Sequence, residues 1–178
     1  LYGGDNENRL KQEMLLGIGG IRALRKMGYN ADIYHCNEGH AAFIGVERMA
    51  NLIEEKGLTY AESREVVRAS TLFTTHTPVP AGHDSFHNDL FGAYMSPYTS
   101  KLGLSWEEFI NLGKVNPGED HFNMSYLASR LSQGINGVSM LHGKVSKGIL
   151  KGLFPGYLEE EIEVGHVTNG VHYSTWAA

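Results

Sequence analysis

The chain has 178 residues, enough for one domain with its own core, and its 42% apolar and 20% charged residues are typical of a globular protein. A formal net charge of −5 argues against a nucleic-acid partner, and the sequence shows neither an apolar run of membrane-spanning length nor a signal peptide. The single cysteine, Cys36, excludes an internal disulfide and favours a reducing compartment, so we expect a cytoplasmic protein without a membrane partner.

Helical and extended patterns alternate along the first half of the chain. Residues 1–8 are polar and contain glycine, which predicts a loop. The apolar periodicity beyond them predicts helices at residues 9–27, 41–56 and 60–69, and short β-branched runs predict strands at residues 31–36 and 71–75. Three glycines, Gly17, Gly19 and Gly20, fall inside the first helix with no strand before them. We therefore attribute them to close helix–sheet packing and not to nucleotide binding.

The second half of the chain alternates in the same way, with more loops. The pattern predicts helical pieces near residues 88–94 and 106–112, helices at 124–133 and 141–153, and strands at 135–140 and 163–168. Strands separated by helices are typical of an α/β fold with a parallel sheet. We therefore expect a Rossmann-like parallel sheet with helices on both faces.

Polar side chains follow each predicted strand at the point where it ends. The residues concerned are Asn37, His40, His76, Thr77, Asn136 and Asn169. The clearest case is His76, which follows the strand at residues 71–75 and begins a loop stiffened by Pro78 and Pro80. Because the carboxyl ends of parallel strands meet at one edge of a sheet, these groups predict a ligand crevice at that edge.

The residue types at this edge suit a carbohydrate. An asparagine or a neutral histidine can both donate and accept hydrogen bonds, as sugar hydroxyls require. The candidate residues are Asn6, Asn37, His76 and Asn169, with a carboxylate from Asp5 or Glu38. The alternative is that these asparagines are turn residues and helix caps, above all Asn169, which precedes a glycine. The histidine spacings do not imply converging ligands, so we expect no metal site.

Six short motifs resemble those of the α-glucan (glycogen, starch or maltodextrin) phosphorylases, in the same order along the chain. They are Leu-Tyr-Gly-Gly-Asp-Asn at residues 1–6 with Arg-Leu-Lys-Gln-Glu at 9–13, Cys-Asn-Glu-Gly-His at 36–40, Phe-Thr-Thr-His-Thr-Pro at 73–78, Phe-Asn-Met-Ser-Tyr-Leu at 122–127, Gly-Ile-Asn-Gly-Val at 134–138 and Val-Thr-Asn-Gly-Val at 167–171. The resemblance is greatest to the shorter bacterial and archaeal members. It implies a pyridoxal-phosphate-dependent glycosyltransferase with the two-domain GT-B fold.

The resemblance also implies roles for nine residues. His76, Asn169, Val138 and Asn6 would bind the glucosyl unit, Asp5 and Arg9 would belong to the gate loop, and Glu38, His40 and Thr77 would lie on the acceptor side. Many family members have Asn-Asp-Thr-His where this chain has Asn-Glu-Gly-His at residues 37–40, so the role of Glu38 is the least secure of the nine. The resemblance implies no catalytic acid or base within this chain.

The resemblance implies that residues 1–178 form the later part of the first GT-B domain and end near the crossover to the second. The chain begins at Leu1 without an initiator methionine, which fits a piece of a longer protein. The whole protein would be a homo-oligomer that carries out reversible phosphorolysis of α-1,4-glucan with orthophosphate, giving glucose 1-phosphate. Its pyridoxal 5′-phosphate would be held by a lysine outside this chain, so we expect the chain alone to be inactive.

Two other functions remain open at this point. A nucleotide-sugar glycogen or starch synthase has the same architecture, and a cofactor lysine in the second domain would distinguish a phosphorylase from it. A non-catalytic carbohydrate-binding domain would be expected to carry exposed aromatic platforms. Trp106 and Trp176 are far apart in the sequence and give no such pattern.

Overall fold

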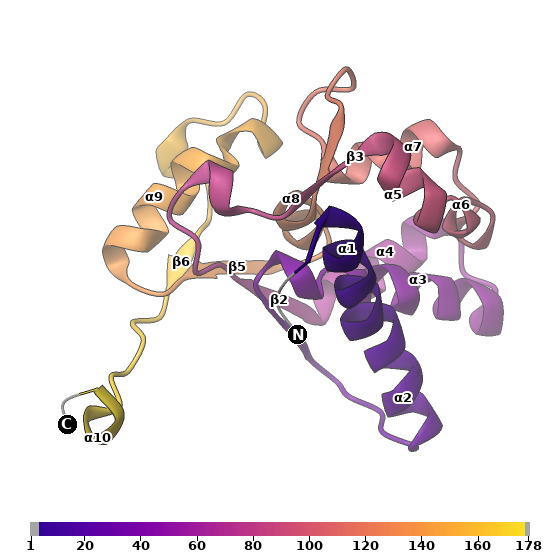
Figure 1. The fold of residues 1–178 in the computed structure, drawn as a ribbon, viewed down its shortest axis with the longest axis horizontal. Helices are drawn as coiled ribbons and strands as arrows, with labels where there is room; N and C mark the ends of the chain where they lie inside the picture. The colour runs from indigo at the N-terminus through magenta and orange to yellow at the C-terminus, as the bar shows by residue number, and fades with distance from the viewer. Residues whose placement is uncertain (1–3, 177–178) are drawn as a thin grey trace.

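The computed structural model describes residues 4–176, in which strands and helices alternate along the chain (Figure 1). The helices are α1 (Asn6–Met14), α2 (Gly20–Lys26), α3 (Phe43–Lys56), α4 (Tyr60–Ala69), α5 (Asn88–Met95), α6 (Pro97–Leu102), α7 (Trp106–Ile110), α8 (Met124–Arg130), α9 (Met140–Leu150) and α10 (Tyr173–Trp176). The strands are β1 (Tyr34–Asn37), β2 (Thr71–Thr74), β3 (Ser85–His87), β4 (His121–Asn123), β5 (Gly134–Gly137) and β6 (Gly165–His166). The beginning of the first motif, at residues 1–3, lies outside the described residues.

Four of the strands form one parallel sheet in the order β1-β2-β5-β6. Cys36 lies opposite Phe73, and Phe73 lies opposite Ile135. The predicted α/β class, a Rossmann-like parallel sheet flanked by helices, is confirmed, and each of the four predicted strand segments contributes one strand. All four strands are shorter than predicted, and the difference is greatest for the last two: β5 ends at Gly137, and β6 has only two residues. The predicted strand at 135–140 is cut short because Ser139 caps α9, its hydroxyl accepting from the His142 amide at 3.1 Å.

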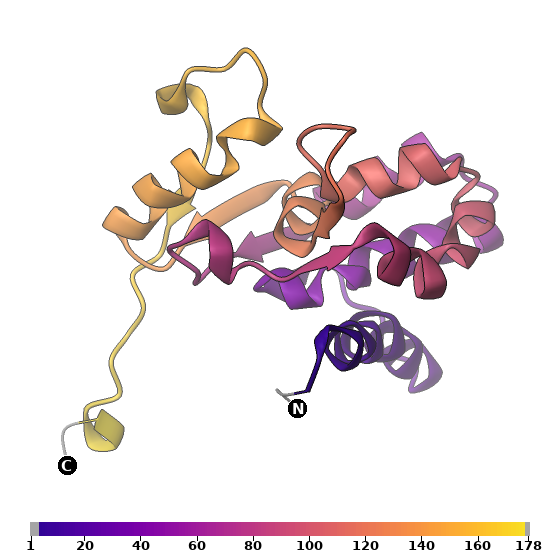
Figure 2. The ribbon, with the colours of Figure 1, turned by 45° about the horizontal axis from the view of Figure 1, so that its top comes forward.

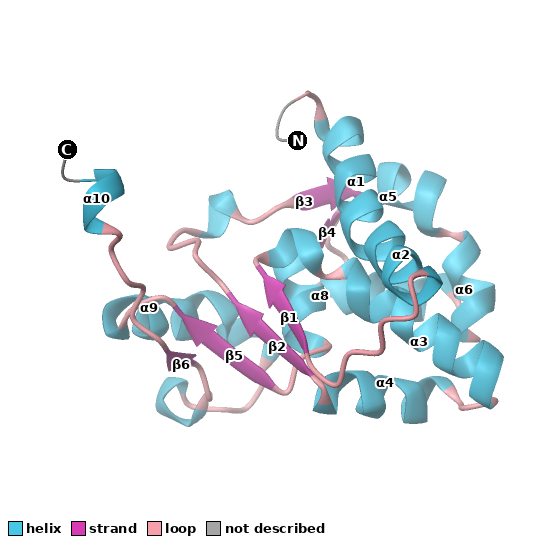
Figure 3. Cartoon of the chain, turned by 90° about the horizontal axis from the view of Figure 1, so that it is seen from below, coloured by secondary structure: helices cyan, strands magenta, loops and turns pink. Residues whose placement is uncertain are grey.

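The two faces of the sheet differ in exposure. Figure 3 shows α8 and α9 behind the sheet, while β1, β2 and β5 are in full view from the other side. Cys36, Phe73 and Ile135, on the covered face, are buried, whereas their neighbours His35 and Leu72 are exposed. This alternation follows from the two-residue period of a strand. The covered face therefore belongs to the apolar core.

The connection from β1 to β2 consists of two helices whose ends are set by local sequence. Gly57 ends α3 with a left-handed φ of 65°, a conformation that glycine adopts without steric cost. Thr59 then begins α4 through a capping box with Glu62, in which each side chain binds the other residue's backbone amide. These signals explain why both helices were predicted at nearly their observed bounds.

The first helix begins earlier than predicted. The side chain of Asp5 accepts a hydrogen bond from the Asn8 amide at 2.9 Å, so α1 starts at Asn6 and the prediction of a loop up to residue 8 was wrong. One π-helical segment, Leu15–Gly19, interrupts the predicted helix and separates α1 from α2.

Gly17 shows why this segment contains small residues. A Cβ atom at Gly17 would lie 2.6 Å from the Cβ of Phe43 and 2.9 Å from the backbone nitrogen of Ile44. The close contact is therefore with the beginning of α3. The expectation that these glycines pack against the sheet was wrong, because the π-helical segment lies against another helix.

A second, antiparallel ribbon was not predicted. β3 and β4 form this ribbon (Figure 2). They pair Phe86 with Phe122, and the Phe122 ring stacks on Phe91 with centroids 3.9 Å apart. Each strand has three residues, too few for a periodic signal. Within residues 4–176, no helix is long and apolar enough to span a membrane.

Candidate functional site

The carboxyl ends of the parallel strands place several predicted site residues at one edge of the sheet. The Thr75 amide donates to the Asn136 carbonyl at 3.0 Å, which extends the pairing of β2 and β5 to the residue before His76. The Asn169 amide donates to the Val138 carbonyl at 3.0 Å, which continues the pairing of β5 and β6 in the same direction. His76, Val138 and Asn169 therefore leave the sheet at the same edge, as expected for parallel strands.

The loop after β2 has a compact shape. Val79 lies between Pro78 and Pro80, which restrict the backbone, and it precedes a 3₁₀ turn at Pro80–Gly82. Gly82 packs so closely that a Cβ atom there would lie 2.7 Å from Cγ2 of Thr77. The loop thus folds back on itself and leaves the His76 side chain exposed.

Glu38 connects the end of β1 to this loop. Its Oε1 accepts from the backbone amides of His76 and Thr77, the latter at 3.0 Å, and from the hydroxyls of Thr75 at 3.2 Å and Thr77 at 3.3 Å. Its Oε2 accepts from the Gly39 amide at 3.3 Å. Glu38 and Thr77, both predicted to lie on the acceptor side, are therefore in direct contact with each other and with the backbone that carries His76.

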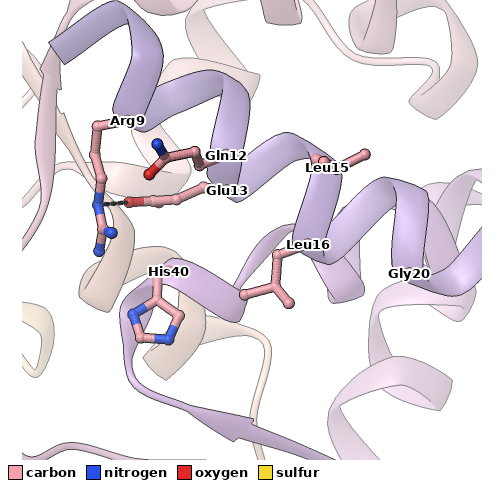
Figure 4. Close-up of a pocket in the computed structure, with 7 residues that line it drawn as sticks. All are labelled: Arg9, Gln12, Glu13, Leu15, Leu16, Gly20 and His40. Atoms are coloured by element: carbon pink, nitrogen blue, oxygen red, sulfur yellow. Dashed lines mark ion pairs between the residues drawn. The ribbon is translucent and has the colours of Figure 1, made fainter. Parts of the chain in front are cut away.

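A cavity of about 300 Å³ lies beside these residues, between α1 and the turn that follows β1. It is lined by Arg9, Gln12, Glu13, Leu15, Leu16, Gly20 and His40. Figure 4 shows Glu13 extending from the helix toward Arg9, with His40 on the wall below them. Arg9, predicted to belong to the gate loop, and His40, predicted to lie on the acceptor side, therefore line one cavity.

Charged groups of both signs meet at the mouth of this cavity. The Arg9 guanidinium donates to both carboxylate oxygens of Asp84, at 3.2 and 2.7 Å, and its Nε lies 3.0 Å from Oε1 of Glu13. Glu13 is only 1% exposed, and burial together with the nearby negative charge of Asp84 raises the pKa of its carboxyl to about 8. Arg9 therefore holds two carboxyl groups of which one, Glu13, favours the neutral form.

The same environment acts on His40. Burial, followed by the positive charge of Arg9, lowers the pKa of the His40 imidazole, while Asp84 and Glu38 oppose that shift. A neutral imidazole can donate from one ring nitrogen and accept at the other, which suits a hydroxyl ligand. The cavity therefore offers hydroxyl-binding chemistry beside an apolar wall.

The remaining predicted residues are only partly brought together. Asp5 and Asn6 are exposed at the beginning of α1, where Asp5 acts as the helix cap. No hydrogen bond joins the side chains of His76 and Asn169, although both are described, and Asn169 is exposed.

Two residues of the charged cluster were missed from the sequence. Glu13 is four residues after Arg9, and this spacing on a helix is a recognisable signal for an ion pair. Asp84 lies 75 residues beyond Arg9, and only the fold places its carboxylate beside the guanidinium.

The described residues offer no metal cluster, and the cavity offers no amine for pyridoxal phosphate. Residues 4–176 contain no group of three or more histidine, cysteine or acidic side chains able to hold a metal ion. The residues that line the cavity include no lysine, so the cavity lacks the amine that would bind the cofactor's aldehyde. We therefore derive no chemical step through either group.

Comparisons with known proteins find similarity to phosphorylases and, at lower identity, to a glycogen synthase. No family model matches the chain. The glycogen phosphorylase of Mycobacterium tuberculosis (strain ATCC 25618 / H37Rv) is 45% identical over 192 residues, which cover 100% of this chain and 22% of that protein. The maltodextrin phosphorylase of Thermococcus litoralis is 46% identical over 176 residues, which cover 99% of this chain and 20% of that protein. Glycogen synthase 1 of Geobacter metallireducens is 26% identical over 181 residues, which cover 97% of this chain and 30% of that protein.

The chain spans about a fifth of the length of these two phosphorylases. The similarity nevertheless runs from end to end of this chain. The comparisons confirm the resemblance predicted from the motifs: over its whole length, this chain is similar to one stretch of proteins named glycogen phosphorylase or maltodextrin phosphorylase.

Proposed function

We propose that this chain is part of an α-glucan phosphorylase. The whole protein would transfer the glucosyl unit at the non-reducing end of an α-1,4-glucan to orthophosphate and release glucose 1-phosphate with retained configuration. The observation that carries the proposal is the end-to-end similarity, at 45% and 46% identity, to relatives that bear phosphorylase names. The position of His76 and Asn169 at one edge of a parallel sheet supports it.

Within this proposal, the strand ends orient the sugar that is transferred. His76 and Asn169 would hydrogen-bond its 6-hydroxyl, and Val138 would contact the same end of the ring. Their support is the shared edge, where the Asn169 amide binds the Val138 carbonyl. Asn6 would contact the sugar from the beginning of α1. These contacts would act by positioning, which lowers the barrier without any proton transfer.

The other predicted residues would surround the path of the glucan. Asp5 and Arg9 would form the gate, and the ion pairs of Arg9 with Asp84 and Glu13 support a fixed position for α1. His40, Thr77 and Glu38 would lie on the acceptor side. Their support is that His40 lines the cavity and that Thr77 hydrogen-bonds Glu38.

The remaining parts of the reaction would lie outside this chain. We propose that a second GT-B domain carries the lysine for pyridoxal 5′-phosphate and the cations that hold the substrate phosphate. The chain would be the later part of the first domain of a cytoplasmic homo-oligomer. It would release no glucose 1-phosphate alone, because the cavity residues supply no lysine for the cofactor.

One observation favours a second candidate. The 26% identity to a glycogen synthase covers almost the whole chain, so transfer from a nucleotide sugar is the alternative. The phosphorylase proposal is preferred because its matches are much closer over the same residues.

The deciding experiment compares two glucosyl donors with the whole protein that contains this chain. We expect glycogen and orthophosphate to yield glucose 1-phosphate, measured by a coupled assay, and no yield when orthophosphate is omitted. Incorporation of glucose from a nucleotide sugar, with no glucose 1-phosphate formed, would establish the synthase instead. The 178-residue chain assayed alone should give no product from either donor.

A further inference from the structure

The carboxylate of Glu38 is almost fully used within the protein. Its Oε1 accepts from two backbone amides and two hydroxyls of residues 75–77, and its Oε2 accepts from the Gly39 amide. A carboxylate offers about four acceptor positions. Little capacity therefore remains on Glu38 for a sugar hydroxyl.

The backbone of Glu38 is held in a conformation that side chains rarely adopt. Its φ is 72° and its ψ is 167°, and among the described residues it is the only non-glycine with positive φ. This region is nearly restricted to glycine, and such strain persists only where the surrounding structure enforces it. The hydrogen bonds from the loop after β2 hold the Glu38 carboxylate in place, and they thereby help to keep the Glu38 backbone in this conformation.

We propose that Glu38 is a positioning residue that fixes the loop carrying His76 and Thr77. Its carboxylate acts as a clamp between the end of β1 and the first turn after β2, and it acts on a ligand only through that loop. The length of the side chain matters, because the carboxylate must reach from β1 across to the amides of the next strand's loop. The functional consequence rests on the proposed glucosyl role of His76, but the clamp itself does not.

The test measures hydrogen exchange by mass spectrometry in the whole protein that contains this chain. In Glu38→Ala and Glu38→Gly, the amides of residues 76 and 77 lose their charged acceptor, so exchange in peptides covering residues 75–78 should rise about tenfold. Glycine tolerates the positive φ and alanine does not, so Glu38→Ala should have the lower Tm of the two. Equal gains in exchange in the two variants would show that loss of the carboxylate, and not the backbone strain, releases the loop.

Two further variants serve as controls. Glu62→Ala removes another carboxylate that accepts from a backbone amide, that of Thr59 at 2.8 Å, and should leave exchange at residues 75–78 unchanged. Glu38→Gln keeps one neutral acceptor oxygen but places an amide group against the Gly39 N–H, so its exchange gain should be smaller than that of Glu38→Ala. A smaller gain in exchange in Glu38→Gln than in Glu38→Ala would show that Glu38 positions the loop and that the variants have not simply lost the fold.

Two results would overturn the proposal. One is unchanged exchange at residues 75–78 in Glu38→Ala; if glucan phosphorolysis is lost as well, Glu38 would be assigned to direct contact with the acceptor. The other is an equal rise of exchange in every peptide of Glu38→Ala and Glu38→Gln, which would assign Glu38 to general stability. If the unmodified protein shows no phosphorolysis, the proposed function fails while the exchange result still decides the clamp.

Discussion

Glu13 is a buried carboxyl at the cavity, and its ionisation affects the stability of the fold around it. It is buried against Arg9 and close to Asp84, and the pKa of its carboxyl is raised to about 8. In the unfolded chain the same carboxyl would have a pKa near 4.3. A raised folded-state pKa contributes stability that is fully present below pH 4.3 and is lost as the pH rises through 8. The folded state should therefore weaken between about pH 5 and pH 8 through this one group.

Glu13→Gln tests this assignment, because glutamine has the same shape and cannot ionise. The variant should lose much of the decline in unfolding free energy between about pH 5 and pH 8, a change on the order of 2–4 kcal/mol. Thermal or urea unfolding at several pH values measures it. Glu7→Gln, on the exposed side of the same helix, is the matched control. The hydrogen bond and ion pair with Lys11 lower the pKa of Glu7, so the ionisation of Glu7 changes the unfolding free energy only below about pH 5. Parallel pH profiles for Glu13→Gln and the unmodified protein would contradict the assignment.

At the scale of elements, local signals decided which parts of the fold could be predicted. The capping box at Thr59 and the left-handed Gly57 depend on residues close together in the sequence. The two helices that they delimit were therefore predicted closely. The β3–β4 ribbon was missed because its three-residue strands are held by long-range ring contacts of Phe122 with Phe91. The strain at Glu38 was missed for the same reason, since its carboxylate partners lie in the loop of another strand.

The π-helical segment between α1 and α2 gives the element-scale prediction. In Gly17→Ala, the new methyl group would lie 2.6 Å from Phe43 Cβ and 2.9 Å from the backbone of Ile44, so the π-helical segment and α3 would have to separate. We expect a loss of about 1–3 kcal/mol in unfolding free energy, measured by urea titration. Gly20→Ala is the control: no atom lies within 4 Å of its added Cβ, and alanine favours the helix, so a gain of up to about 1 kcal/mol is expected. Equal effects of the two substitutions would mean that helix packing does not select Gly17.

At the scale of the whole molecule, the alternation of helical and extended patterns was enough to predict the parallel sheet. Parallel strands then determine which residues share an edge, so His76 and Asn169 could be placed at one edge of the sheet from the sequence. The cavity could not be placed in this way. It depends on how α1 lies against the turn at Gly39–Ala41, which is set by packing between elements distant in the sequence.

The last prediction concerns the two strand ends in the whole protein. His76 and Asn169 leave the sheet at one edge, and both residues are exposed in residues 4–176, so each is open to a ligand. If both bind the 6-hydroxyl of the transferred glucose, removing either leaves that hydroxyl short of a partner, at a cost of about 1–3 kcal/mol. His76→Ala and Asn169→Ala should each lower kcat/KM with glucose 1-phosphate by about 10- to 100-fold, and the double variant should lose less than the product of the two.

A donor without carbon 6 supplies the control for this prediction. Xylose 1-phosphate has no 6-hydroxyl, so His76→Ala and Asn169→Ala should change its kcat/KM far less than that of glucose 1-phosphate, both measured in the direction of glucan synthesis. The comparison cancels any general damage to the fold, because the same variant is assayed with both donors. Equal losses with the two donors would show that neither side chain recognises the 6-hydroxyl. The shared edge of the sheet would then position some other part of the substrate.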